Sequence, residues 1–101
     1  MVQVRPLRLR YTPAALAELE QVLAYLSELS PQGAQRVRTR IRAVLELLSD
    51  FPRNGARVGQ LRRIRATPYP YLIFYEIAGN EIVVVAVRHG ARDPSKMPNP
   101  S

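Results

Sequence analysis

The fold is decided by the stretch Ile82-Val83-Val84-Val85-Ala86-Val87, which is apolar at every position. A strand with one face in water alternates apolar and polar residues, so a continuous apolar run predicts a strand in the interior of a sheet. We expect this strand to extend from Glu81 to Arg88. The segment Tyr71 to Ile77 predicts a neighbouring strand, and Ala78-Gly79-Asn80 predicts the hairpin turn that joins the two.

Further elements are predicted on the amino-terminal side of this hairpin. Leu61 to Ala66 predicts a short strand, and the preceding segment from Pro52 to about Gln60, with Asn54-Gly55 and Gly59, predicts a loop. Leu7 to Tyr11 alternates apolar and basic residues, as a half-buried strand does.

Two helices are predicted between the first strand and that loop. Thr12-Pro13 and Ser30-Pro31 each combine a capping residue with a proline suited to the first helical position. Apolar residues follow each signal at helical spacing. The stripes consist of Leu16, Leu19, Val22, Leu23, Leu26 and Leu29 in the first helix, and of Val37, Ile41, Val44, Leu45 and Leu48 in the second. So close a break between the helices predicts a helical hairpin.

The element order is therefore β-αα-βββ. This order predicts an α+β fold in which the helical hairpin packs on one side of a small, mainly antiparallel sheet. We expect a single domain over residues 1–93. The proline-rich segment 94–101 is expected to form a flexible tail.

The composition limits the kinds of chemistry available to this chain. Its 101 residues suit one small core, and no run of apolar residues is long enough to span a membrane, so a cytoplasmic protein is expected. The chain has no cysteine and a single histidine, and no glycine-rich loop follows a strand. We therefore expect neither a metal site nor a cofactor.

The charge indicates an acidic partner. The net charge is +7, and all of the fifteen basic residues except Lys96 are arginine. Arginine binds phosphate or carboxylate through two parallel hydrogen bonds, so nucleic acid and acidic protein surfaces are both suitable partners. A GC-rich genome would also raise the arginine content, but it would not explain where the arginines cluster.

The arginines cluster on the predicted sheet and on the second helix. Arg63 and Arg65 share one face of their strand by alternation, and Arg88 ends the apolar strand. The pairs Arg36/Arg40 and Arg38/Arg42 bring like charges together at helical spacing. Two alternative interpretations are open. The arginines on these faces are simply solvated, and His89 has a structural role in the turn after the last strand.

Two short motifs add to this pattern: Tyr69-Pro70-Tyr71-x-x-x-Tyr75 on one strand, and Arg88-His89-Gly90-x-Arg92-Asp93-Pro94 after the last one. With the element order, they resemble the RelE/ParE toxin superfamily, most closely its ParE branch, from about Leu7 to Pro94. The resemblance implies a toxin of a type II toxin–antitoxin module that a cognate antitoxin neutralises. The residues expected to contact the target or the antitoxin are Arg36, Arg40, Arg63, Arg65, Arg88 and Arg92.

Two activities are known in the superfamily. A ParE-like toxin inhibits DNA gyrase and needs no catalytic residue. A RelE-like toxin is a ribosome-dependent mRNA interferase, and here Arg65 and Arg88 would hold the phosphate while His89 carried the proton. The chain lacks a tyrosine after Tyr75, and its only lysine is Lys96, so we expect the gyrase inhibitor. A module that has lost toxicity and only sequesters an antitoxin or nucleic acid is a third hypothesis.

Overall fold

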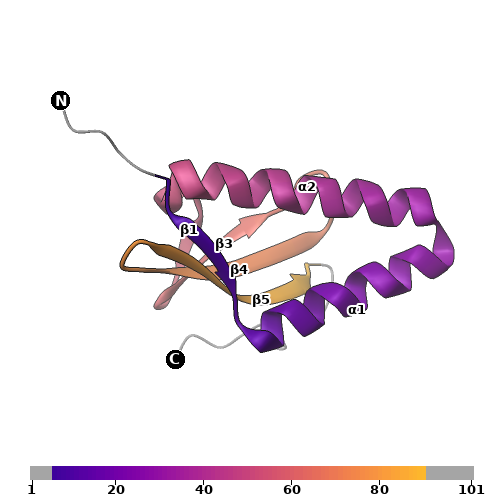
Figure 1. Ribbon diagram of the computed structural model, residues 1–101, viewed down its shortest axis with the longest axis horizontal. Helices are drawn as coiled ribbons and strands as arrows, with labels where there is room; N and C mark the ends of the chain where they lie inside the picture. Colours follow the sequence, from indigo (N-terminus) through magenta and orange to yellow (C-terminus); the bar gives the residue numbers. More distant parts are fainter. Residues whose placement is uncertain (1–5, 91–101) are drawn as a thin grey trace.

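A helical hairpin covers one face of a five-stranded sheet in the computed structural model, which describes residues 6–90 (Figure 1). The elements are β1 (Arg8–Tyr11), α1 (Pro13–Leu29), α2 (Pro31–Asp50), a short 3-10 helix η1 (Pro52–Asn54), β2 (Ala56–Val58), β3 (Leu61–Arg65), β4 (Tyr71–Ala78) and β5 (Glu81–His89). The predicted α+β fold and its helical hairpin are confirmed.

The strands lie in the order β1-β5-β4-β3-β2. β1 runs parallel to β5, with Arg8 opposite Glu81, while the other pairs are antiparallel. β5 is thus an interior strand, as its unbroken apolar sequence predicts. One residue of β5, Val85, has no partner on β4, and this bulge lets Val84 and Val87 both face the helices.

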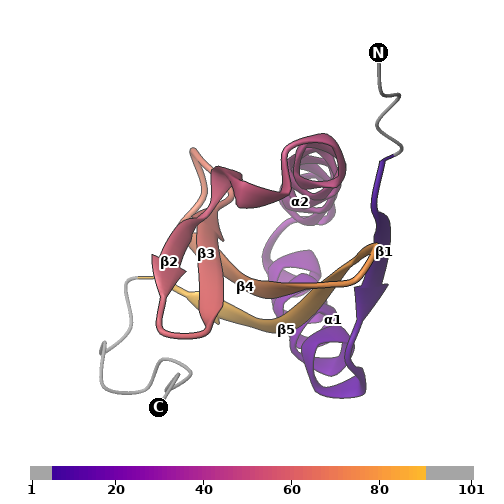
Figure 2. The ribbon, with the colours of Figure 1, turned by 90° about the vertical axis from the view of Figure 1, so that its left-hand side faces the viewer.

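The segment predicted as a loop contains an additional strand. Ala56–Val58 pairs with β3 across a tight turn in which Gly59 has a φ of 62°. Three residues are too few to produce a recognisable alternating pattern. They form a strand only because they pair with the edge of β3. Figure 2 shows this β2–β3 hairpin at the end of the sheet opposite β1.

Both predicted helix starts are confirmed by side-chain caps. The Thr12 hydroxyl accepts a hydrogen bond from the Ala15 amide at 3.1 Å, and the Ser30 hydroxyl accepts one from the Gly33 amide at 3.0 Å. Ser30 also ends α1, since its own amide donates to the Leu26 carbonyl. One residue therefore closes the first helix and opens the second.

The core lies between the hairpin and the sheet. Its buried members are Ala15 and Leu23 from α1, Val37, Ile41, Val44, Leu45 and Leu48 from α2, Ala66 after β3, Tyr71, Ile73 and Tyr75 from β4, and Ile82, Val84 and Val87 from β5. The aromatic residues of β4 are thus packing residues, as strand aromatics usually are.

Several predictions concern residues outside the described range. Arg92, the domain boundary at residue 93 and the predicted tail 94–101 all lie beyond residue 90. Within residues 6–90, neither helix combines the length and the apolar character that crossing a membrane requires.

Candidate functional site

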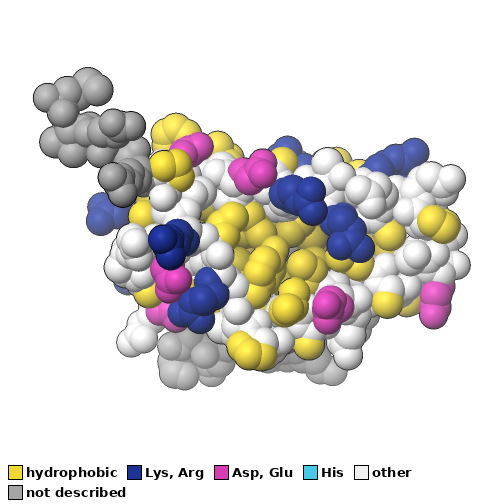
Figure 3. Space-filling model, viewed as in Figure 1, with side chains coloured by type: hydrophobic (Ala, Val, Ile, Leu, Met, Phe, Trp, Pro, Cys, Tyr) yellow, Lys and Arg dark blue, Asp and Glu magenta, His cyan; other side chains and the backbone are white. Residues whose placement is uncertain are grey.

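An apolar groove opens between α1, α2 and β1. In Figure 3, hydrophobic side chains gather in a hollow between the two helices, and basic side chains stand along its upper rim. The groove has a volume of about 380 Å³ and is lined by Leu9, Tyr11, Leu19, Leu23, Arg38, Ile41, Arg42, Leu45 and Glu46. Each of the three elements supplies leucine or tyrosine to the lining of the groove.

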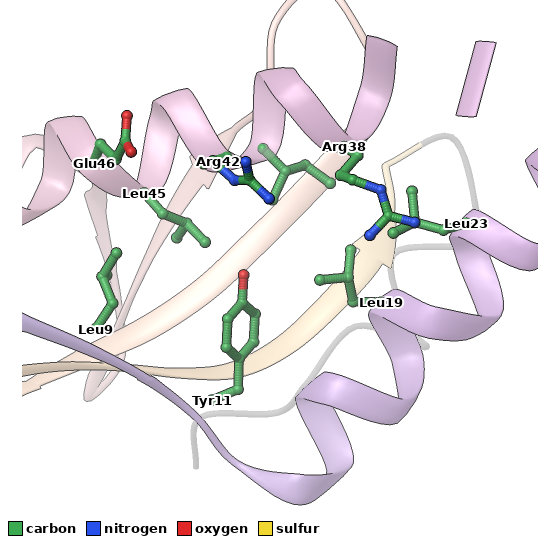
Figure 4. Close-up of a pocket in the computed structure, with 9 residues that line it drawn as sticks. Leu9, Tyr11, Leu19, Leu23, Arg38, Arg42, Leu45 and Glu46 are labelled. Atoms are coloured by element: carbon green, nitrogen blue, oxygen red, sulfur yellow. The ribbon is translucent and has the colours of Figure 1, made fainter. Parts of the chain in front are cut away.

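Charged side chains from α2 border the groove (Figure 4). Tyr11 extends from β1 toward Arg42. Arg38 lies one helical turn closer to the turn that joins α1 and α2. Burial raises the pKa of the Tyr11 hydroxyl, and the positive charge of Arg42 partly offsets that increase. The hydroxyl is therefore neutral at physiological pH and remains a hydrogen-bond donor. The groove suits a segment with apolar side chains on one face and acidic groups beside them.

The two arginine pairs of α2 lie on opposite flanks of the helix. Arg38 and Arg42 line the groove, whereas the Arg40 guanidinium donates to the Thr67 carbonyl at 2.6 Å, on the β3 side. Arg36 lies one turn before Arg40 on that same flank. The expected contact residues Arg36 and Arg40 are thus not groove residues. The sequence pattern is the same for both pairs, and only the packing against α1 distinguishes them.

The other predicted arginines meet on the sheet face that points away from the helices. Arg65 pairs with Leu72 across the strands, and Leu72 pairs with Arg88, so these three residues form one row. Arg63 lies in the next row, opposite Phe74. The sheet therefore brings Arg63, Arg65 and Arg88 onto one basic face; strand alternation predicted that Arg63 and Arg65 share it, and the strand pairing adds Arg88.

Two of these arginines already have partners within the protein. The Arg65 guanidinium donates to the Tyr69 carbonyl at 3.2 Å. Arg88 forms an ion pair with Glu18 of α1, and the same carboxylate accepts a hydrogen bond from the Val87 amide at 2.9 Å. Glu18 occupies the edge of β5 beyond the end of β1. Sequence reasoning missed Glu18, because nothing local indicates that β1 stops short of this edge.

His89 lies on the opposite face of the sheet from Arg88. It pairs with Tyr71, and the two rings meet edge to face with their centroids 5.3 Å apart. Tyr71 belongs to the helix-facing core. The proton carrier proposed for a nuclease therefore does not share a face with the two arginines proposed to hold the phosphate. Within residues 6–90, no three acidic or histidine side chains gather into a set that could hold a metal ion.

These features define a small basic α+β protein with an apolar groove on one side and an arginine face on the other. The family model described as "ParE toxin of type II toxin-antitoxin system, parDE" matches residues 9–94. The chain therefore belongs to the ParE family of type II toxin–antitoxin toxins.

Two relatives agree with membership of the wider RelE/ParE superfamily, and a solved structure agrees with the fold. The chain is 34% identical over 83 residues to Toxin RelE2 of Caulobacter vibrioides, and the aligned region covers 81% of this chain and 93% of that protein. It is 28% identical over 79 residues to Toxin RelE1 of the same organism, covering 75% and 85%. A chain of the chromosomal ParDE TA system from P. aeruginosa has the same fold, with a TM-score of 0.71 at 19% identity, covering 82% of this chain and 95% of that one.

Proposed function

We propose that this protein is a toxin that inhibits DNA gyrase and that a cognate antitoxin protein neutralises it. The observation that carries the proposal is the match to the ParE family over nearly the whole described domain. The proposal is also supported by the position of His89, which lies on the opposite face of the sheet from Arg65 and Arg88, so that these residues do not assemble a catalytic group. An inhibitor that acts by binding a protein needs no assembled catalytic group.

The apolar groove is the surface that we assign to the antitoxin. An amphipathic antitoxin segment would bury its apolar side chains against Leu19, Leu23 and Leu45, and acidic side chains beside them would meet Arg38 and Arg42. Two like charges four residues apart repel each other in the free toxin, so an acidic partner relieves that repulsion. Binding would thus combine apolar burial with charge neutralisation.

A matched pair of variants tests the groove. Arg42→Glu reverses a charge at the rim, whereas Arg36→Glu makes the same change on the other flank of α2. We expect the dissociation constant for the co-purified antitoxin, measured by titration calorimetry, to rise at least about tenfold for Arg42→Glu only, as for a charge pair in a protein interface. Equal effects of the two substitutions would contradict the assignment.

A RelE-like mRNA interferase is the second candidate. It is favoured by the row that joins Arg65 to Arg88 on the sheet face away from the helices, where two cations could hold one phosphate. The relatives named RelE2 and RelE1 are consistent with it. Against it stands His89, which packs on Tyr71 at the opposite face.

A supercoiling assay with the purified toxin, gyrase, ATP and relaxed plasmid tests the proposed function. We expect loss of supercoiling with trapped double-strand breaks, reversed by the antitoxin. If gyrase is unaffected and ribosome-bound mRNA is cleaved instead, the interferase is correct. In that case Arg65→Ala, Arg88→Ala and His89→Ala should reduce cleavage, the last by at least about a hundredfold as for loss of a general acid or base. Inactivity in both assays would indicate a module that only sequesters its partner.

A further inference from the structure

An exposed apolar cluster lies at the end of α2, away from the groove. Phe51 is 62% exposed and Leu47 is 43% exposed. Together with Asp50, Pro52, Arg53 and Asn54, they line a second hollow of about 660 Å³. Leu47 falls on the flank of α2 that carries Arg36 and Arg40, not on the flank that lines the groove. Figure 2 views the molecule from this end, where the chain leaves α2 and continues through η1 to β2.

Buried groups fix the turn that presents Phe51. The Tyr75 hydroxyl donates to the Pro52 carbonyl at 2.7 Å and accepts from the Gly55 amide at 2.9 Å. The Arg62 guanidinium donates to the Gly55 carbonyl at 2.9 Å. The exposed aromatic ring is therefore attached to a turn whose backbone is already held in place. Such a side chain loses little freedom when a partner binds it, which favours its use as an interface anchor.

Unpaired positive charges flank the cluster. Arg53 and Arg57 are exposed, and neither forms an ion pair with any residue in the described range. They line an adjoining polar hollow of about 590 Å³, which shares Pro52 and Arg53 with the apolar one. The combined surface thus places an apolar recess next to two guanidinium groups that form no ion pair within the described residues; Arg57 donates to the Gly59 carbonyl at 3.3 Å, and Glu76 also lines the polar hollow. We call the residues Leu47, Phe51, Arg53 and Arg57 the α2-end surface.

We infer that the α2-end surface binds an acidic segment of the toxin's target protein, with an apolar side chain of that segment inserted beside Phe51. The apolar recess favours a protein partner, because a phosphate backbone would contact the arginines and leave Leu47 uncovered. The inference rests on the proposed function in that it requires a protein target. Because the α2-end surface and the groove occupy different flanks of α2, the antitoxin and the target have separate contact surfaces.

Two substitutions and a control test this inference. Phe51→Ser removes the anchor, and Arg53→Glu reverses a charge without altering the Arg53 carbonyl that Arg62 contacts. Leu29→Ser is the matched control, because Leu29 is 67% exposed at the other end of the hairpin. The readouts are the toxin concentration for half-inhibition of gyrase supercoiling, growth arrest after induction in a bacterial host, and the thermal midpoint of each purified variant.

We expect Phe51→Ser and Arg53→Glu each to raise the half-inhibition concentration at least about tenfold and to abolish growth arrest, as removal of an interface anchor does. Leu29→Ser should behave as the wild type, and all three variants should keep its thermal midpoint. Wild-type potency of the folded Phe51→Ser variant would overturn the inference. If only Arg53→Glu is impaired, the surface binds phosphate and not an apolar side chain, which also overturns it.

The same readouts separate this inference from the proposed function. A wild-type protein that arrests growth but leaves gyrase active refutes gyrase as the target, and growth arrest by the variants then tests the α2-end surface alone. A wild-type protein without effect in either assay refutes both. If the folded Phe51→Ser and Arg53→Glu variants inhibit gyrase as strongly as the wild type does, only the α2-end surface is refuted.

Discussion

The Tyr75 hydroxyl holds the chain between α2 and β2, and its removal should destabilise the protein measurably. Tyr75 is fully buried on β4. Its hydroxyl donates to the Pro52 carbonyl at 2.7 Å and accepts from the Gly55 amide at 2.9 Å. Gly55 is buried as well, so no water can take over as the acceptor for its amide. The substitution Tyr75→Phe keeps the ring and removes both hydrogen bonds.

The expected loss of stability follows from these two bonds. A buried amide left without an acceptor costs about 1–3 kcal/mol, and the Pro52 carbonyl, which is closer to the surface, costs less. Because the ring remains, no sizeable cavity adds to the loss. We therefore expect the free energy of unfolding to fall by about 2 kcal/mol. For a domain of this length, that loss lowers the thermal midpoint by about 8–16 °C.

Urea denaturation followed by circular dichroism measures this change. Tyr25→Phe is the control, since Tyr25 is 62% exposed on α1 and its hydroxyl forms no hydrogen bond within the described residues. The control should match the wild type within about 0.5 kcal/mol, as surface substitutions usually do. The reasoning is refuted if Tyr75→Phe also stays within that margin.

Alkaline pH supplies a second readout of the same hydroxyl. Burial raises the pKa of Tyr75 above its ordinary value of 10.0, and the Gly55 amide and the Arg62 charge lower it in part. Above pH 10 the unfolded chain therefore loses its phenolic proton before the folded chain does. The contribution of the Tyr75 proton to the free energy of unfolding is fully present below this pH and decreases as pH rises toward the folded pKa. The decrease should be smaller in Tyr75→Phe, which lacks this phenolic group.

Substitutions of Gly55, Glu18 and Ser30 test other parts of the fold by urea denaturation. Gly55→Ala should cost about 1–3 kcal/mol, because the new Cβ would lie 2.5 Å from the Tyr75 hydroxyl; a wild-type midpoint would contradict this overpacking. Glu18→Ala should cost about 1–2 kcal/mol and Glu18→Gln less, since only alanine leaves the Val87 amide without its acceptor; equal losses would refute that role. Ser30→Ala should cost about 1 kcal/mol by removing the α2 cap, and Ser27→Ala, which caps no helix, is its control.

Most elements of the fold follow from local sequence signals. The capping residues Thr12 and Ser30, each followed by proline, mark the helix starts, and the unbroken apolar run of β5 indicates an interior strand. The three-residue strand β2 carried no such signal, because its pairing depends on the edge of β3. Local patterns specify elements that carry a capping signal or are fully buried, and they miss a short element that only pairing with a neighbour stabilises.

The candidate sites depended more strongly on the tertiary structure. Strand alternation predicted that Arg63 and Arg65 share a face, and the pairing of β4 with both neighbours added Arg88 to it. The helix sequence gave no reason to prefer one flank of α2 over the other, since both carry arginines four residues apart. The packing of α1 decided that Arg38 and Arg42 line the groove.

The sequence by itself determined the helical hairpin, the apolar central strands and the excess of positive charge, because these depend on residue type and spacing along the chain. Only the tertiary structure decided that His89 faces Tyr71 and not the arginine row, that Glu18 pairs with Arg88, and that Phe51 stands exposed on a fixed turn. Each of these relations joins residues far apart in the chain or depends on burial, and no local pattern encodes either property.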